Sequence, residues 1–322
     1  MKQQLFICPR CHTSLDRVAA DRLVCPQDGL EYWNVEGIWR FLLPESQAHY
    51  TRFIADYEAI RRSEGRGSPD ADYYRALPFK DLSGTFSTDW AIRARSFDVL
   101  VKQVLTPLQD LLQRPLKVID LGAGNGWLSN HLAAQGDRVF AVDLLVNEQD
   151  GLGAWKHYEH PFTPMQAEFN HLPIMDRFAD VVIFNASFHY SEDYIETLKE
   201  ALRVLNVEGM LVIMDSRIYR RRSSGEKMVE ERKAAFLAQY GLASDSLESE
   251  NFLTYQQIDE LGDSFGIRWM YFRPFYGFRW LLRPLKAWLT RKREPARFHL
   301  IAAFKEADQE AMETPSQRIT VD

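Results

Sequence analysis

A glycine-rich loop in the middle of the chain has the residue types and spacing to bind a small ligand. Residues 118–126 read Val-Ile-Asp-Leu-Gly-Ala-Gly-Asn-Gly, an apolar strand that runs into the loop and then a helix. Because glycine has no Cβ atom, a ligand can reach the backbone and the free N–H groups at the start of that helix. A dinucleotide-binding loop, G-x-G-x-x-G, is the alternative, but Trp127 replaces its last glycine here. Asp120, just before the loop, also favours a ligand with an ammonium group over one with phosphates.

A second acid follows the next expected strand. Residues 138–143 read RVFAVD and end in Asp143, 23 residues after Asp120. A carboxylate at this strand end can accept hydrogen bonds from both hydroxyls of a ribose. The loop and the two acids therefore favour S-adenosylmethionine (SAM), which combines a ribose with an amine and a cationic sulfonium.

The order of these motifs resembles that of the class I SAM-dependent methyltransferases. Asp-Leu-Gly-Ala-Gly-Asn-Gly is followed by Ala-Val-Asp-Leu, and residues 167–182 resemble the family's segment from its third to its fourth strand. The resemblance covers about residues 100–305. It implies that Glu168 meets the adenine amine, that the Phe169 backbone lies beside the ring, and that Asn185 ends the fourth strand. The implied cofactor residues are Asp120, Gly122, Gly124, Asp143, Leu144, Glu168, Phe169 and Asn185.

The candidate catalytic residues, His189 and Tyr190, follow the fourth expected strand, where open α/β sheets bind ligands. Methyl transfer from a sulfonium mainly requires alignment of the reacting atoms, and a base is needed only if the acceptor must lose a proton. His189 could be that base, since an unperturbed imidazole has a pKa of about 6.5. Alternatively, both residues only shape the pocket. Upstream, Tyr73, Tyr74 and Trp90 could form a lid over it or belong to the core.

The three cysteines of the chain lie within its first 25 residues and are candidate metal ligands. Cys8 and Cys11 form Cys-Pro-Arg-Cys, and Cys25 begins Cys-Pro-Gln-Asp, which ends at Asp28. An odd, clustered set favours metal binding over disulfides in a chain without an export signal. The pattern resembles a zinc-ribbon-like module found beside methyltransferases, including bacterial ribosomal RNA guanine methyltransferases. It implies one Zn²⁺ held by Cys8, Cys11, Cys25 and Asp28, where ribbons usually have a fourth cysteine. His12 is a substitute donor, and a metal-free fold is the alternative.

Residues 268–297 combine basic and aromatic side chains: nine are Lys or Arg, and Glu294 is the single acid. A helical wheel of this insert separates two sides. The basic side consists of Arg279, Arg283 and Lys286, together with Thr290. The apolar side consists of Trp280, Leu281, Leu285 and Trp288. Such a helix, kinked by Pro284 or starting there, is typical of peripheral contact with a membrane. The alternatives are a helix docked on its own domain and contact with RNA.

Alternating strands and helices, expected from about residue 115, position the candidate site. The expected strands are residues 116–121, 138–143, 180–186, 209–215, 266–272 and 297–304. The helix after the glycine loop is expected to end at Gly136, and Ser191 is expected to cap the next helix. This order predicts an α/β fold, a Rossmann-like, doubly wound and largely parallel sheet of the class I methyltransferase type, with a small N-terminal zinc-ribbon-like domain.

The expected organisation has four parts. They are a zinc-ribbon-like module (1–45), a helical linker or lid (46–110, with a break at 63–70), a SAM-binding methyltransferase domain (111–306, with the insert 268–297) and a disordered tail (307–322). The net charge of −6 argues against broad nucleic-acid binding, and no apolar run is long enough to span a membrane. The opening residues lack the apolar core of a signal peptide, so we expect a cytoplasmic protein.

These features together predict a SAM-dependent methyltransferase that acts on a small-molecule acceptor. The aromatic and basic insert favours a hydrophobic or lipid-linked acceptor, such as a quinone or a glycan-lipid intermediate, with peripheral membrane contact through residues 268–297. An RNA base methyltransferase is the alternative that the N-terminal module and the insert suggest. A non-catalytic SAM-binding or scaffold protein is the alternative from another class.

Overall fold

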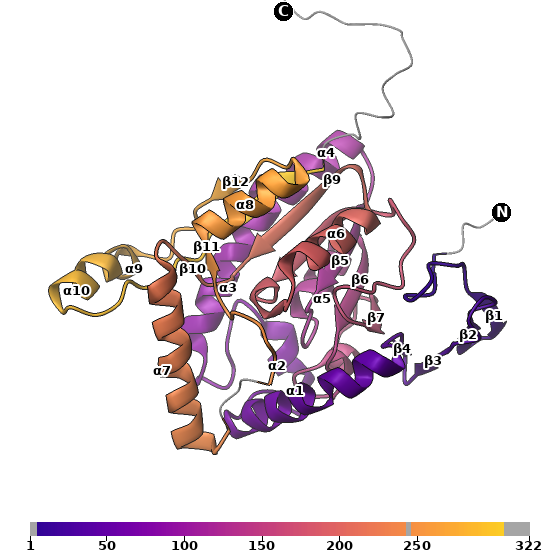
Figure 1. Cartoon of the computed structure of the whole chain (residues 1–322), viewed down its shortest axis with the longest axis horizontal. Coiled ribbons are helices and arrows are strands. Elements are labelled where there is room, and N and C mark those ends of the chain that lie inside the picture. The colour runs from indigo at the N-terminus through magenta and orange to yellow at the C-terminus, as the bar shows by residue number, and fades with distance from the viewer. Residues whose placement is uncertain (1–4, 243–245, 306–322) are drawn as a thin grey trace, which may run out of the picture.

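The computed structural model describes residues 5–242 and 246–305 and shows a central sheet covered by helices (Figure 1). Within these residues, eleven strands form one sheet in the order β1-β2-β3-β4-β7-β6-β5-β8-β9-β13-β12, and β10 pairs with β11. The strands are β1 (Asp16–Ala19), β2 (Arg22–Val24), β3 (Glu31–Val35), β4 (Ile38–Arg40), β5 (Lys117–Leu121), β6 (Arg138–Asp143), β7 (Thr163–Gln166), β8 (Ala179–Asn185), β9 (Leu205–Met214), β10 (Ile218–Tyr219), β11 (Leu253–Thr254), β12 (Met270–Phe272) and β13 (Leu300–Phe304). The α-helices are α1 (Pro44–Ser63), α2 (Ala71–Ala76), α3 (Ser87–Leu100), α4 (Thr106–Leu112), α5 (Trp127–Ala134), α6 (Tyr194–Val204), α7 (Arg222–Tyr240), α8 (Tyr255–Phe265), α9 (Phe278–Leu281) and α10 (Arg283–Leu289). The predicted tail, residues 307–322, lies outside the described residues.

The strands β7, β6, β5, β8 and β9 run parallel to one another. The chain crosses the sheet from β5 to β6 and β7 in one direction, then returns to place β8 and β9 on the other side of β5. Ligands bind in such sheets outside the carboxyl ends of the strands, where the direction reverses. At the far edge, β13 is antiparallel to β9, and β12 is antiparallel to β13. The predicted Rossmann-like, largely parallel α/β sheet is confirmed, with an antiparallel edge and shorter final strands than expected.

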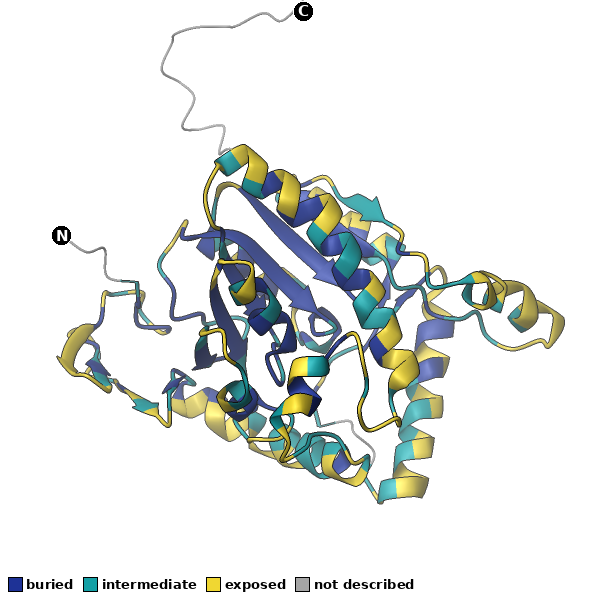
Figure 2. Ribbon diagram, turned by 180° about the vertical axis from the view of Figure 1, so that it is seen from behind, coloured by how far each residue is buried: buried dark blue, intermediate teal, exposed yellow. Residues whose placement is uncertain are grey.

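Each face of the sheet has its own hydrophobic cluster, because successive residues of a strand point to opposite sides. In β5, Ile119 and Leu121 belong to the cluster covered by α6 and α8, whereas Val118 belongs to the cluster covered by α3 and α5. All three residues are fully buried. Burial on both faces explains why these strands are uninterrupted apolar runs in the sequence. In Figure 2 the central strands are accordingly dark blue beneath their helices.

The N-terminal strands extend the main sheet rather than pack around a separate core. β4 pairs in parallel with β7, with Trp39 opposite Met165. An isolated bridge between Phe6 and Ile174 adds a second connection. Buried side chains of this segment, such as Tyr32, belong to the same hydrophobic cluster as the central strands. The segment that carries the cysteines is therefore attached directly to the edge of the central sheet.

The helices before the central sheet follow the prediction. α1 ends at Ser63 and α2 begins at Ala71, so the break expected at 63–70 is present. Tyr73, Tyr74 and Trp90 are buried in the cluster under α3 and α5, as the core alternative requires. These aromatic residues stabilise the helical layer against the sheet.

The expected cap of α6 is wrong by two residues. The carboxylate of Asp193 accepts hydrogen bonds from the N–H groups of Ile195 and Glu196 and is the N-cap. The hydroxyl of Ser191 lies 2.8 Å from that of Thr197 instead. Serine and aspartate are equally good caps, and the aspartate is the one at the first helical turn.

Two features of the C-terminal half were not expected from the sequence. The long helix α7 buries few of its residues, Ser224, Gly225 and Met228, so it has little apolar periodicity. The predicted insert forms two short helices, α9 and α10, which project from the body of the molecule (Figures 1 and 2). Pro284 lies in the first turn of α10, as the sequence suggested. Among the described residues, no helix is long and apolar enough to cross a membrane.

Candidate cofactor and acceptor site

The glycine loop lies at the carboxyl end of β5, beside the end of β8. Gly122 and Gly124 have φ angles of 76° and 56°, which residues with a Cβ atom rarely adopt. A Cβ atom at Gly122 would lie 2.3 Å from the Cβ atom of Ser187, so glycine alone fits there. The N–H of Gly122 donates to the carbonyl of Val142 (2.8 Å), which ties the loop to β6. The loop thus presents bare backbone to a cavity of about 280 Å³.

Asp143 ends β6 on the same side of the sheet and lines this cavity. One carboxylate oxygen accepts the N–H of Gly124 (2.8 Å), and the other accepts the N–H of Leu145 (2.8 Å). Each oxygen keeps a second lone pair for a ligand hydroxyl. Burial raises the pKa of Asp143 to about 6, although the two backbone donors act against that rise.

Glu168 is the third acid of the cavity and is 8% exposed. Its carboxylate accepts hydrogen bonds from the hydroxyl of Ser46 and from that of Tyr50 (3.3 Å), and Nδ1 of His171 lies 3.1 Å away. Burial alone would raise the pKa of Glu168, but the approach of His171 and the bond from Ser46 hold it below its usual value. The side chain therefore remains a carboxylate that can accept a hydrogen bond from an amine.

Asn185 and Phe169 complete the cofactor end of the cavity. The side-chain oxygen of Asn185 is buried and has no hydrogen-bond partner among the described residues, which leaves an acceptor for a ligand. The ring of Phe169 would contact a Cβ atom at Gly122 (3.4 Å) and therefore lies beside the glycine loop. Leu144 also lines the cavity.

Seven of the eight predicted cofactor residues thus line one cavity, and Asp120 does not. The lining residues are Gly122, Gly124, Asp143, Leu144, Glu168, Phe169 and Asn185. Asp120 is fully buried below the loop, where one carboxylate oxygen accepts the hydroxyl of Ser129 (2.8 Å). Burial raises its pKa to about 7. Asp120 therefore supports the loop from the side of the core.

The residues of the cavity fit SAM. The bare backbone of the glycine loop leaves room for the ligand, and the carboxylates of Asp143 and Glu168 can accept the ribose hydroxyls and the adenine amine. The unpartnered oxygen of Asn185 supplies a further acceptor. Within the described residues, neither Asp143 nor Glu168 is ion-paired with an arginine, although Glu168 is already contacted by Ser46, Tyr50 and His171.

His189 and Tyr190 line the same cavity. His189 is 2% exposed; its Nδ1 lies 3.2 Å from the hydroxyl of Ser216, and its Nε2 lies 3.4 Å from Nη1 of Arg217. Burial, followed by the charges of nearby arginines, holds the pKa of His189 well below its usual value. The imidazole is therefore neutral at physiological pH and has an unprotonated nitrogen.

Helix α1 supplies part of the cavity wall that the sequence did not predict. Ser46, Tyr50, Phe53 and Tyr57 recur at helical spacing, and the rings of Phe53 and Tyr57 each lie 6.2 Å from that of Tyr190. This polar and aromatic stripe, at i, i+4, i+7 and i+11, is the signal that could have identified the helix as part of the site.

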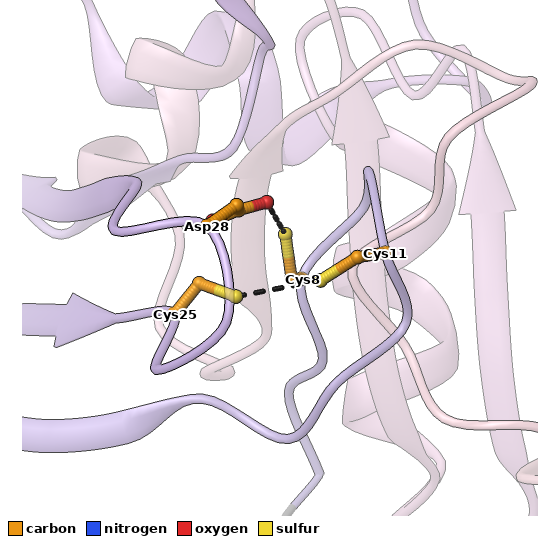
Figure 3. Close-up of side chains that lie close together, drawn as sticks. All are labelled: Cys8, Cys11, Cys25 and Asp28. Carbon is orange, nitrogen blue, oxygen red and sulfur yellow. Dashed lines mark hydrogen bonds between the residues drawn. The ribbon is translucent and has the colours of Figure 1, made fainter.

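The three cysteines and Asp28 form a separate cluster at the edge of the sheet (Figure 3). Their four potential ligand atoms lie within 4.8 Å of one another. The thiol of Cys8 donates to a carboxylate oxygen of Asp28 (3.2 Å), and the sulfur atoms of Cys11 and Cys25 are 3.4 Å apart. A tetrahedral Zn²⁺ with bonds of about 2.3 Å holds its sulfur ligands roughly 3.8 Å apart, so this donor set fits zinc. His12 is not part of the group.

Comparisons with known proteins agree with this architecture. Residues 119–213 match a family model described as "Methyltransferase domain". Dimethylglycine N-methyltransferase from Parasynechococcus marenigrum is 31% identical over 155 residues, which cover 46% of this chain and 55% of that protein. Malonyl-[acyl-carrier protein] O-methyltransferase 1 from Coxiella burnetii is 28% identical over 126 residues, which cover 37% of this chain and 43% of that protein. The chain thus spans about half of the length of these curated relatives.

Among solved structures, a similar one is the 1,6-didemethyltoxoflavin-N1-methyltransferase of Burkholderia thailandensis with bound 1,6-didemethyltoxoflavin and S-adenosylhomocysteine. Its TM-score is 0.45 at 14% sequence identity, over 91% of this chain and 99% of that one.

The central part of the chain is a class I SAM-dependent methyltransferase domain. The matched segment, residues 119–213, runs from β5 to β9 and includes the glycine loop, Asp143, Glu168 and Asn185. These are the strands and side chains that build the cofactor end of the cavity.

Proposed function

We propose that the chain transfers the methyl group of SAM to a small-molecule acceptor. The observation that carries this proposal is that the glycine loop, Asp143, Glu168, His189 and Tyr190 line one and the same cavity. SAM, when bound, supplies an electrophilic methyl group on a sulfonium. The protein's task is then to hold the acceptor in line with that group and to exclude water. The two curated relatives, whose names specify dimethylglycine and malonyl-[acyl-carrier protein], support an acceptor outside nucleic acids.

His189 is the proposed proton acceptor for an acceptor atom that must lose a proton. Its neutral imidazole is buried and lines the cavity, and Arg217 lies 3.4 Å from its Nε2, so Arg217 must move away from Nε2 before that nitrogen can take a proton. The hydroxyl of Ser216 holds Nδ1 at 3.2 Å and orients the ring. An acceptor that is already an unprotonated nucleophile would use His189 and Tyr190 as walls only.

The proposed acceptor is hydrophobic or lipid-linked, and the exposed insert supports contact with a membrane. Seven large apolar residues between positions 275 and 289 are each more than half exposed. They are Phe275, Phe278, Leu281, Leu282, Leu285, Trp288 and Leu289. Exposed apolar surface of this extent is typical of a surface that binds a partner.

Basic side chains accompany this apolar surface, so its proposed partner is an anionic lipid bilayer. Arg279, Lys286, Arg291 and Lys292 are exposed on the same projection, in a chain whose overall charge is −6. Lysine and arginine near an anionic bilayer are attracted to it, and apolar side chains insert at headgroup depth. Trp280, which the sequence placed on the apolar side, packs instead against Tyr276 and Phe298 (ring centres 5.1 and 5.7 Å apart). It supports the base of the projection.

We also propose that Cys8, Cys11, Cys25 and Asp28 bind one Zn²⁺ with a structural role. The four donors come from two turns, one before β1 and one between β2 and β3, and a metal would join these turns. The site is remote in sequence from the cavity residues and belongs to the edge of the sheet formed by β1–β4.

Labelled SAM and a fractionated cell extract test the proposed function. The protein is incubated with both, and the label is followed into lipid, small-molecule and RNA fractions. Label in the lipid or small-molecule fraction is the expected result. Transfer to RNA would support the alternative that the basic insert and the cysteine cluster suggest, and SAM binding without any transfer would support a non-catalytic protein.

A further inference from the structure

The charges of three arginines from three separate elements act on His189, which lines the cavity. Arg93 comes from α3, Arg217 follows β9, and Arg232 comes from α7. Nη1 of Arg217 lies 3.4 Å from Nε2 of His189, and the charges of all three act on the imidazole. Arg93 and Arg217 line the cavity itself. Positive charge is therefore concentrated beside His189.

These arginines lack the carboxylate partners that other arginines near the cavity have. Arg61 forms an ion pair with Asp150 (2.6 Å), and Arg66 forms one with Glu64 (2.8 Å). Within residues 5–242 and 246–305, no ion pair of up to 4.0 Å includes Arg93, Arg217 or Arg232. Nε and Nη2 of Arg232 are buried and have no hydrogen-bond partner there. Guanidinium groups that are buried without an anion are costly, so a functional reason is expected.

Among the acids of the cavity, Asp215 interacts electrostatically with Arg93, but the two form no ion pair of up to 4.0 Å within the described residues. One carboxylate oxygen of Asp215 accepts the hydroxyl of Ser96 (2.5 Å), and burial raises the pKa of Asp215, against the charge of Arg93. Asp89 lies 3.8 Å from Arg66, and Glu192 lies 2.8 Å from His49. Three arginines thus act on His189, whereas Asp215 acts on Arg93, so the positive charge beside His189 is only partly matched.

We infer that Arg93 and Arg217, with Arg232 behind them, form an oxyanion-binding subsite, and that the methyl acceptor carries a carboxylate or phosphate group. This inference rests on the proposed methyl transfer, since it names the class of acceptor. Guanidinium groups bind both anions through paired hydrogen bonds. The neighbouring rings of Tyr57, Tyr190 and Trp90 contact the apolar part of such an acceptor.

Binding of the anion also changes His189. The three arginine charges disfavour the imidazolium form, and a bound anion offsets those charges. The pKa of His189 therefore rises when the acceptor binds. The imidazole of His189 is therefore more basic while the methyl acceptor is bound. In the free enzyme its lower pKa keeps it unprotonated.

Binding of simple anions to the full-length protein saturated with S-adenosylhomocysteine tests the subsite. Inorganic phosphate and acetate are titrated separately by calorimetry, so that the two oxyanion classes are distinguished. We expect saturable binding of at least one of them, weakened roughly tenfold or more by Arg93→Gln and by Arg217→Gln. Arg217→Lys should retain more affinity than Arg217→Gln. Arg95→Gln is the matched control, because this exposed arginine lies on the same helix as Arg93.

Two readouts separate this inference from the proposed function. The ring proton shifts of His189 should report a higher pKa with phosphate or acetate than without, in the wild type but not in Arg217→Gln. Affinity for S-adenosylhomocysteine should be unchanged in all variants, which shows that they are folded. The subsite alone would be overturned if the protein binds S-adenosylhomocysteine but neither anion. It would also be overturned if anion affinity is the same in the wild type, Arg93→Gln and Arg217→Gln. If S-adenosylhomocysteine itself does not bind, the proposed function fails, and titration of the anions without it still tests the arginines.

Discussion

A Cβ atom at Gly122 would lie 2.3 Å from the Cβ atom of Ser187. These two residues follow β5 and β8, the adjacent strands at which the order of strand addition reverses. The hydroxyl of Ser187 also donates to the carbonyl of Leu121 (2.5 Å), so the backbone of one strand end is held by the side chain of the next. The close approach of the two strand ends defines the shape of the cofactor cavity.

Gly122→Ala should therefore destabilise the protein and abolish SAM binding. The positive φ alone costs about 1–2 kcal/mol for a residue with a Cβ atom, and the overlap with Ser187 adds to that. Gly136→Ala is the control, because Gly136 has a φ of 93° but a Cβ atom added there would have no other atom within 4 Å. Chemical denaturation should show a larger loss of stability for Gly122→Ala than for Gly136→Ala, and calorimetry should show loss of SAM binding in Gly122→Ala alone. Unchanged SAM affinity in Gly122→Ala would contradict the proposal that the glycine loop binds SAM.

SAM affinity should fall as the pH drops below about 6. Burial raises the pKa of Asp143 to about 6, and only the carboxylate form accepts hydrogen bonds from both ribose hydroxyls. Below that pKa, the affinity should decrease by up to about tenfold per pH unit. Asp143→Asn should lower the affinity at neutral pH and remove this dependence. Glu168 does not contribute in this range, since its pKa lies below its usual value.

Asp120 provides the control for the pH dependence. Burial raises its pKa to about 7, and it lies below the loop without lining the cavity. The folded form binds a proton that the unfolded form releases, so this group lowers stability as the pH rises from about 4 towards 7. Asp120→Asn should flatten the stability profile in this window and leave the fall in SAM affinity below pH 6 in place. A SAM profile that follows Asp120 instead would refute the role given to Asp143.

One zinc ion per chain is expected in protein purified without added metal. Cys25→Ser should lose the ion, because three thiolates and one carboxylate are the available donors. Asp28→Cys should retain it, and His12→Ala should also retain it, since His12 lies outside the cluster. Elemental analysis measures the content of each variant. A wild-type content near zero in folded protein would mean that Tyr32 and its neighbours hold this segment without a metal.

The features that were predicted correctly from the sequence are those with a local pattern. β5 and β8 are buried on both faces, so each is an apolar run, and the glycine loop follows directly. The pairing of β4 with β7 joins residues more than a hundred positions apart and has no local pattern. The same holds for Arg93, Arg217 and Arg232, which tertiary structure alone brings to His189. The mostly exposed α7 lacked the apolar periodicity on which helix prediction depends.

The projection formed by α9 and α10 is connected to the cavity through Tyr276. Its hydroxyl lies 2.8 Å from that of Ser96, which in turn donates to the cavity residue Asp215. Arg283 stacks on Trp280 at 3.8 Å at the base of the projection, whereas Arg279 and Lys286 are exposed. These contacts link the base of the projection to the cavity residue Asp215.

The full-length protein should sediment with anionic phosphatidylglycerol vesicles at low salt and not with neutral phosphatidylcholine vesicles. Each basic residue near such a surface contributes about 1 kcal/mol, so Arg279→Glu with Lys286→Glu should weaken binding by roughly 30-fold or more. Phe278→Ser with Trp288→Ser should also weaken it, because these residues are 78% and 74% exposed and so available for insertion. Lys80→Glu with Lys102→Glu, which makes the same change in net charge at exposed sites outside the projection, should have little effect. Higher salt should weaken binding as the Debye length shortens below about 10 Å. An equal loss of vesicle binding in the Lys80/Lys102 control would mean that net charge alone explains the effect. If the protein does not bind vesicles but forms a dimer or an RNA complex that depends on Phe278 and Trp288, the projection binds that partner instead.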